Sequence, residues 1–178
     1  MSICPITSGR TEPCNDSIGG LNAFIAIPYV ADAFTITAGE VTAIDAGITE
    51  AFKFELRADA NIFNFDGVSD ENTGTSVFNE TLTVALKKLD KDSNIQIELL
   101  QKGLHYIIPI SRNGSYQLMG STDGARVTAS NNTTGGARTD FNGYNVTATS
   151  VSKIAAPFFD ATTITALEAI VSDTNINP

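Results

Sequence analysis

Apolar and polar residues alternate along much of the chain, which is the pattern expected of β-strands. In the clearest stretch, Ala51–Ala58, the even positions are apolar, whereas Lys53, Glu55 and Arg57 occupy three of the odd positions. The stretch Thr75–Lys88 alternates in the same way over a greater length. Because successive side chains of a strand point to opposite faces, each stretch predicts a strand with one buried face.

Other short segments, separated by turn-forming residues, also have the composition of strands. They are Leu21–Tyr29, Phe34–Thr37, Val41–Ile44, Tyr106–Ser111, Ser115–Met119, Arg126–Ser130 and Tyr144–Lys153. The Asn113-Gly114 pair predicts a tight turn, and Thr122–Gly124 predicts another. The polar, glycine-rich stretch Ser130–Asp140 predicts a long loop, of a length that indicates a functional or interface role.

A long β-hairpin is predicted over Asn61–Lys88. Its middle, Asp66–Gly74, is polar and acidic and contains glycine, so it is expected to be a mobile loop at the tip. The second strand, Thr75–Lys88, exceeds the usual length of about five or six residues. One face of that strand is apolar and is formed by Phe78, Leu82, Val84 and Leu86.

One helix is predicted over Asn94–Lys102. Ser93 and Gln96 have the spacing of a capping box, and Gly103 is a suitable stop. A strand is the alternative, because Ile95, Ile97 and Leu99 alternate. A second short helix over Thr162–Ser172 is weakened by its β-branched residues.

These elements predict a mainly β fold, a β-sandwich or barrel with one flanking α-helix and a long β-hairpin. No linker or repeat divides the 178 residues, so we expect a single domain over residues 1–178. Residues 1–20 are expected to form an N-terminal arm and residues 160–178 a C-terminal extension.

Composition and charge restrict the classes of function that fit this sequence. Hydrophobic residues make up 42% and charged residues 17%, as in a globular protein. With 11 basic and 20 acidic residues the net charge is −9, which disfavours binding to DNA phosphates. The first residues lack the pattern of a signal peptide, and no apolar run reaches the roughly 20 residues of a membrane span. We therefore expect synthesis in a cytoplasm and no membrane partner.

Residues with catalytic or ligating chemistry are sparse. His105 is the single histidine, and Cys4 and Cys14 are free thiols or a short-loop disulfide. The acids Asp66, Asp70 and Glu71 do not have the spacing of a known calcium loop. We expect no enzymatic activity, no metal and no cofactor.

Assembly is the interpretation that the pattern favours instead. Many short strands and a two-faced hairpin predict exposed sheet edges, which an assembling protein can pair between subunits. An ordinary β-sandwich with a long hairpin is the alternative.

The order of elements resembles that of phage tail tube proteins. It places a long hairpin at Asn61–Lys88, a helix at Asn94–Lys102, and then two strands joined by Asn113-Gly114. A loop with Gly135, Gly136 and Asp140 then leads through Gly143-Tyr144 into a final strand. The opening stretch, with Cys4, Arg10, Cys14 and Gly19-Gly20, resembles structural proteins of phages that infect Bacteroidetes-like bacteria.

This resemblance implies a virion protein of the tail, assembled in the host cytoplasm. Six subunits would form a ring, and stacked rings would contact other tail proteins and conduct double-stranded DNA without binding it specifically. The hairpin residues Phe78, Leu82, Val84 and Leu86 are then expected at the assembly interface. The channel is expected to be net negative, with Glu80 as the favoured lumen-facing residue; the other candidates are Asp66, Asp70 and Glu71, with Glu55 and Asp59.

Two alternatives stay open, the first within the same class of function and the second from a different class. One is another virion structural protein, such as a neck or head-decoration protein. The other is a carbohydrate-binding β-sandwich, for which the absence of Trp and the four Tyr are unfavourable.

Overall fold

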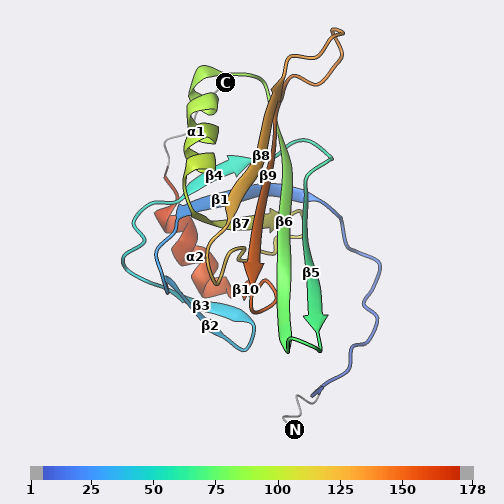
Figure 1. Ribbon diagram of the computed structural model, residues 1–178, viewed down its shortest axis with the longest axis vertical. Helices are drawn as coiled ribbons and strands as arrows, with labels where there is room; N and C mark the ends of the chain where they lie inside the picture. Colours follow the sequence, from blue (N-terminus) through green and yellow to red (C-terminus); the bar gives the residue numbers. More distant parts are fainter. Residues whose placement is uncertain (1–5, 173–178) are drawn as a thin grey trace.

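The computed structural model describes residues 6–172 and confirms a mainly β fold (Figure 1). The described elements form three sheets and two helices. In chain order they are β1 (Leu21–Pro28), β2 (Phe34–Thr37), β3 (Glu40–Ile44), β4 (Phe52–Glu55), β5 (Ile62–Asp70), β6 (Thr75–Lys87), α1 (Lys91–Lys102), β7 (His105–Ser111), β8 (Arg126–Thr133), β9 (Gly143–Ser152), β10 (Phe158–Phe159) and α2 (Ala161–Ile170).

The middle layer is the sheet β4-β1-β7, and its strands β1 and β7 are buried on both faces. Phe24 and Ala26 of β1 face one core cluster, whereas Ala23, Ile25 and Ile27 face the other. A strand between two apolar layers needs no polar face, so β1 reads as an almost continuous apolar run.

On one side of this layer lies the four-stranded antiparallel sheet β5-β6-β9-β8, which we call the long sheet. Its inner side chains meet β1, β7 and the buried residues Ile97 and Leu100 of α1. On the other side lie the small sheet β10-β3-β2 and α2. Three layers thus enclose two hydrophobic clusters.

Helix α1 begins earlier than the predicted Ser93 cap. Asp90 is the N-cap, because its carboxylate accepts hydrogen bonds from the N–H groups of Asp92 and Ser93, at 3.0 and 3.2 Å. The predicted stop at Gly103 is confirmed as the C-cap. A Cβ at this glycine would lie 2.3 Å from the ring of His105, so a larger residue would require the His105 ring to move.

The hairpin tip is shorter than predicted. Strand β5 continues to Asp70, and the turn between β5 and β6 occupies only residues 71–74. Each residue of Asp66–Asp70 is paired with one of Thr75–Asn79 across the hairpin. Cross-strand pairing therefore overrides the low strand propensity of Asp, Gly and Ser.

Two further boundaries differ from the prediction. Strand β8 continues to Thr133, so the loop before β9 covers residues 134–142. The predicted strand Ser115–Met119 is reduced to isolated bridges, Ile107 to Met119 and Ile110 to Tyr116. The turn at Asn113-Gly114 before it is confirmed, with Gly114 at φ +80°.

The two ends of the chain differ in how they join the core. Residues 6–20 contain no helix or strand; Ile18 donates its N–H to Asn113 Oδ1 at 3.0 Å. The C-terminal segment is not merely an extension, because α2 buries Leu167 completely. Asp160 caps that helix by accepting a 2.6 Å bond from the Thr163 N–H, and the side chain and then the backbone of Thr163 lower the pKa of its carboxyl group. Cys4 and residues 173–178 lie outside the described residues.

Candidate assembly interface

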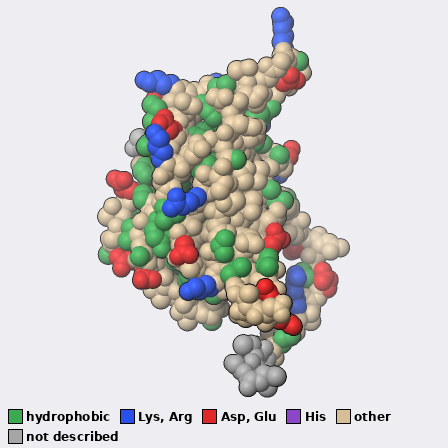
Figure 2. Space-filling model, viewed as in Figure 1, with side chains coloured by type: hydrophobic (Ala, Val, Ile, Leu, Met, Phe, Trp, Pro, Cys, Tyr) green, Lys and Arg blue, Asp and Glu red, His purple; other side chains and the backbone are tan. Residues whose placement is uncertain are grey.

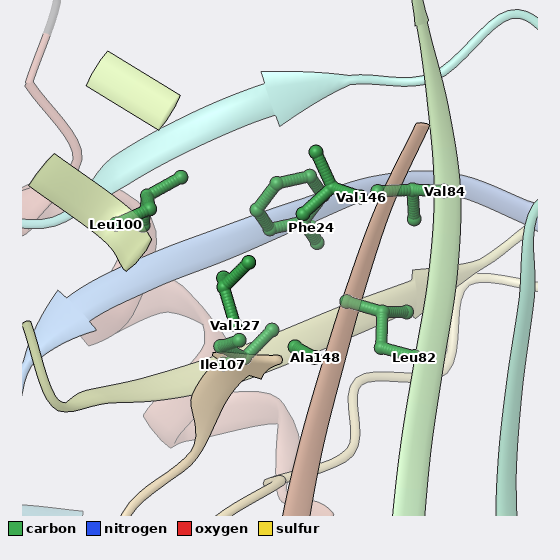
Figure 3. A pocket seen from close by; sticks show the side chains of 8 residues that line it. All are labelled: Phe24, Leu82, Val84, Leu100, Ile107, Val127, Val146 and Ala148. Carbon is green, nitrogen blue, oxygen red and sulfur yellow. The ribbon is translucent and has the colours of Figure 1, made fainter. Parts of the chain in front are cut away.

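The apolar face of β6 points into the subunit, which corrects the predicted interface. Leu82 and Val84 are 2% and 1% exposed and belong to the core, so they are not free to contact another subunit. Phe78 and Leu86, on the same face, are half-buried. Figure 3 shows the inner side chains that surround a small apolar gap between the long sheet, the middle layer and α1: Phe24, Leu82, Val84, Leu100, Ile107, Val127, Val146 and Ala148.

Glu80 is also buried, so the prediction that it faces a channel is wrong. It lies on the inner face of β6 with Leu82, and its side chain is 0% exposed. One carboxylate oxygen, Oε2, accepts a 2.8 Å hydrogen bond from the N–H of Gly120. Burial raises the pKa of this carboxyl group.

Hydroxyl and amide side chains make up the centre of the outer face of the long sheet, and the apolar side chains Ile62, Val68 and Val151 lie exposed on the same face around them. At its centre Thr81 of β6 is paired with Thr149 of β9, and Thr83 with Thr147. Asparagines continue the face on all four strands: Asn64, Asn79, Asn131 and Asn145. Figure 2 shows this face over β6, β8 and β9 as largely tan, the colour of uncharged polar groups and backbone.

Charges on this outer face balance. The strand alternation places Asp66 and Asp70 of β5, Lys87 of β6 and Arg126 of β8 on it. The predicted acids Asp66, Asp70 and Glu71 are exposed, the last in the hairpin turn. The charges on this face therefore nearly cancel, and it has no basic cluster.

Both outer strands of the long sheet lack a neighbour on one side. Strand β5 is paired only with β6, and β8 only with β9, among the described strands. All three pairings within the sheet are antiparallel, so β5 and β8 run in opposite directions. If β5 of one copy lay beside β8 of the next, the antiparallel alternation would continue without a break.

Apolar side chains are exposed near each of these edges. Phe65 of β5 is 42% exposed although it faces the inner side of the sheet. Helix α1 packs beside β8 and leaves Ile95 and Leu99 43% and 55% exposed. A β5-to-β8 junction would bring these two apolar regions to the same side of the joined sheet.

The two ends of the long sheet carry different connections. At one end the hairpin turn is acidic, with Asp70 accepting a 2.8 Å bond from the Asn72 N–H. At the other end the loop 134–142 projects beyond the sheet and contains Arg138 (Figure 1). Asp140 braces this loop by accepting hydrogen bonds from the N–H groups of Gly136 and Ala137, at 2.9 and 2.7 Å, which lower the pKa of its carboxyl group.

The candidate catalytic residues are not brought together. His105 is half-buried beside Gly103, and burial lowers its pKa. Cys14 is exposed in the N-terminal arm. Among residues 6–172 no group of three or more His, Cys, Asp or Glu could hold a metal ion. Neither described helix is long and apolar enough to cross a membrane.

Comparison of the chain with protein-family models, with curated proteins and with solved structures found no match.

Sequence reasoning missed the residues that define this surface. The alternation of Thr81 and Thr83 with Leu82 was visible, but polar positions on a strand usually mark only the solvent face. The paired positions Thr147 and Thr149 repeat the same Thr-x-Thr spacing, which was the available signal.

Proposed function

We propose that this chain is a structural subunit that assembles through the free edges of the long sheet into a tube, the tail tube of a long-tailed bacteriophage. Strand β5 of one copy pairs with β8 of the next, and the ring closes after six copies. The observation that carries the proposal is the pair of unpartnered, oppositely directed edges on one four-stranded sheet. Pairing one patch with a different patch on the next copy generates a ring when the rotation closes.

The lack of edge protection supports this use of the long sheet. Soluble proteins commonly cover an edge strand or place Lys or Pro on it. Strand β5 contains neither residue, and eight of its nine residues are exposed. Extension of the sheet by a second copy satisfies these backbone groups and covers Phe65.

The outer face of the long sheet forms the channel wall in this proposal. Its central threonines and asparagines offer hydrogen bonds to water but no net charge. Lys and Arg clusters hold DNA because neutralised phosphates release counterions. A wall without such a cluster lets DNA pass without specific binding. The proposed channel is thus neutral rather than negative, because Glu80 is buried and the charges on this face balance.

Stacking of rings uses the two ends of the sheet. The loop 134–142 carries Arg138, and the hairpin turn at the opposite end carries Asp70 and Glu71. When rings stack in one direction, these ends meet. The Asp140 carboxylate is bound to N–H groups of its own loop, so Arg138 can pair with Asp70 and Glu71, and this pairing favours that order over the reverse one.

Negative-stain microscopy together with sedimentation velocity of the purified full chain tests the proposal. We expect rings or hollow tubes whose abundance rises with protein concentration. A chain that stays monomeric over the whole accessible concentration range would contradict it. Solid particles or flat sheets would retain assembly but reject the tube.

A further inference from the structure

A buried carboxyl group joins the long sheet to the turn that precedes β8. Glu80 reaches from β6 to Gly120, and Ser150 of β9 donates to the carbonyl of Gly124 at 3.2 Å. The two strands thus hold the turn Gly120–Gly124 at both of its ends. The turn is itself closed by a 3.0 Å bond from the Gly124 N–H to the Gly120 carbonyl.

The turn is closely packed at its first residue and paired with β7 on both sides. Gly120 has φ +85°, and a Cβ there would lie 2.6 Å from the backbone nitrogen of Ala125. On either side the chain is paired with β7, through bridges from Met119 to Ile107 and from Ala125 to His105. The contact at Glu80 therefore links the long sheet to the middle layer.

Hydrogen bonding around Glu80 is incomplete for an ionised carboxylate. Its Oε1 has no partner, and two hydroxyl oxygens are likewise buried without one: that of Ser152 on β9 and that of Ser121, which follows Gly120 in the chain. Only the Gly120 N–H is in hydrogen-bond geometry with the carboxylate. A buried carboxylate whose neighbours are one N–H group and neutral serine hydroxyls, with no cation, is strongly disfavoured.

The groups that face Glu80 from each neighbouring element are uncharged. Phe65 of β5 and Ser150 of β9 lie directly opposite it, and Ser152 lies two residues further along β9. Its pKa is raised by burial, against smaller opposite effects of Gly120, Ser152 and Ser150, and no charged side chain contributes. The ionisable residues adjoining these positions are Asp66, Asp123, Lys153 and, beyond the turn, His105.

We propose that Glu80 is held as a neutral carboxylic acid in the folded subunit, and that its proton stabilises the contact between the long sheet and the turn Gly120–Gly124. A proton on Oε1 turns this oxygen into a donor, for which the Ser152 hydroxyl is an acceptor. Loss of the proton leaves a buried negative charge that weakens the contact between the layers. This inference concerns the single subunit and does not depend on the proposed tube.

The direction of the pH effect follows from linkage. A carboxyl group with a raised pKa in the folded state binds its proton more tightly there than in the unfolded chain. Its contribution to stability is therefore full below the ordinary pKa of glutamate and is lost as the pH rises through the folded value. Glu80→Gln stays neutral and can still accept the Gly120 N–H, so it removes this loss.

Urea unfolding of the wild-type chain and Glu80→Gln between acid and alkaline pH tests the proposal, with the exposed Glu50→Gln as the matched control. We expect the urea midpoint of Glu80→Gln to rise relative to that of the wild-type chain as the pH rises. The difference between the midpoints of Glu50→Gln and the wild-type chain should not change with pH in this way. The proposal would be overturned if the midpoint of the wild-type chain rose relative to that of Glu80→Gln with increasing pH. It would also be overturned if the difference between the two midpoints did not depend on pH.

A second measurement needs no variant. The carboxyl carbon resonance of Glu80 in the wild-type chain reports its protonation directly. We expect it to remain in the protonated position above the pH at which the exposed glutamates titrate. Titration together with them, or at lower pH, would overturn the proposal even if Glu80→Gln failed to fold.

Discussion

The two faces of the long sheet share one backbone but carry different side chains. The inner face packs Leu82, Val84 and Val146 against the middle layer, whereas the outer face presents Thr81, Thr83 and their partners on β9. Stability of the subunit therefore resides on one face, and the surface available to other molecules lies on the other. Neighbouring residues on one strand are expected to affect different properties, folding or assembly.

The largest expected effect separates folding from surface on adjacent residues. Leu82→Ala removes a fully buried side chain and should lower the free energy of unfolding by about 2–5 kcal/mol. Thr83→Ala, one residue along, should change it by no more than about 0.5 kcal/mol. Urea unfolding of dissociated subunits measures both values. Similar losses for the two variants would mean that the outer face also carries subunit stability.

A second effect concerns the free edge of β5. The N–H groups of successive strand residues point in opposite directions, so one of Val68 and Ser69 donates to β6 and the other points to the free edge. Of the two variants Val68→Pro and Ser69→Pro, only one therefore removes a hydrogen bond to β6. That variant should lose about 1 kcal/mol of stability. The other should keep its stability and lose assembly, because the edge can no longer donate to β8. Sedimentation velocity and urea unfolding, applied to both variants, identify which is which.

If the variant with unchanged stability still assembled normally, β5 would not be an assembly edge. The inner-face hairpin residues that the sequence indicated are not suitable for this test. Replacing Leu82 or Val84 with Asp would unfold the subunit before assembly could be measured, because both side chains lie in the core.

The smallest expected effect concerns the two ends of the long sheet. Arg138→Glu should shorten tubes, and so should the double change Asp70→Lys with Glu71→Lys, since each puts like charges at the stacking contact. Combining all three changes restores opposite charges and should restore length. Exposed ion pairs contribute only about 0–1 kcal/mol each, so the effect should disappear at high salt. Tube lengths in micrographs at low and high salt provide the measurement. Failure of the combined variant to recover at low salt would argue against this contact.

Periodicity predicted the strands well but not the use of their faces. Alternation correctly grouped Glu80 with Phe78 and Leu82, yet nothing local indicates that this group faces the core rather than a neighbouring subunit. The answer depends on Gly120, forty residues away in sequence, which supplies the N–H that allows a carboxyl group to be buried there. Such a contact depends on tertiary structure and leaves no mark in the alternation.

Boundaries failed where local and long-range preferences compete. Asp66–Asp70 has the composition of a loop, but pairing with Thr75–Asn79 keeps it in β5. At α1, Ser93 and Asp90 are both good caps, and the side-chain bonds of Asp90 decide the start. The C-terminal segment is predicted as an extension, whereas α2 belongs to the core: Leu167 is fully buried, and Ile164 and Ile170 pack against the same cluster.

The most direct test of the account is the accessibility of the outer face in assembled protein. In a chain with Cys4→Ser and Cys14→Ser, Thr83→Cys should react with a bulky maleimide when subunits are dissociated and become protected in tubes. Gln96→Cys, on the exposed side of α1, should react in both states. Protection of Thr83→Cys alone would agree with a channel lined by the long sheet. Equal reactivity of Thr83→Cys in tubes and in dissociated subunits would contradict it.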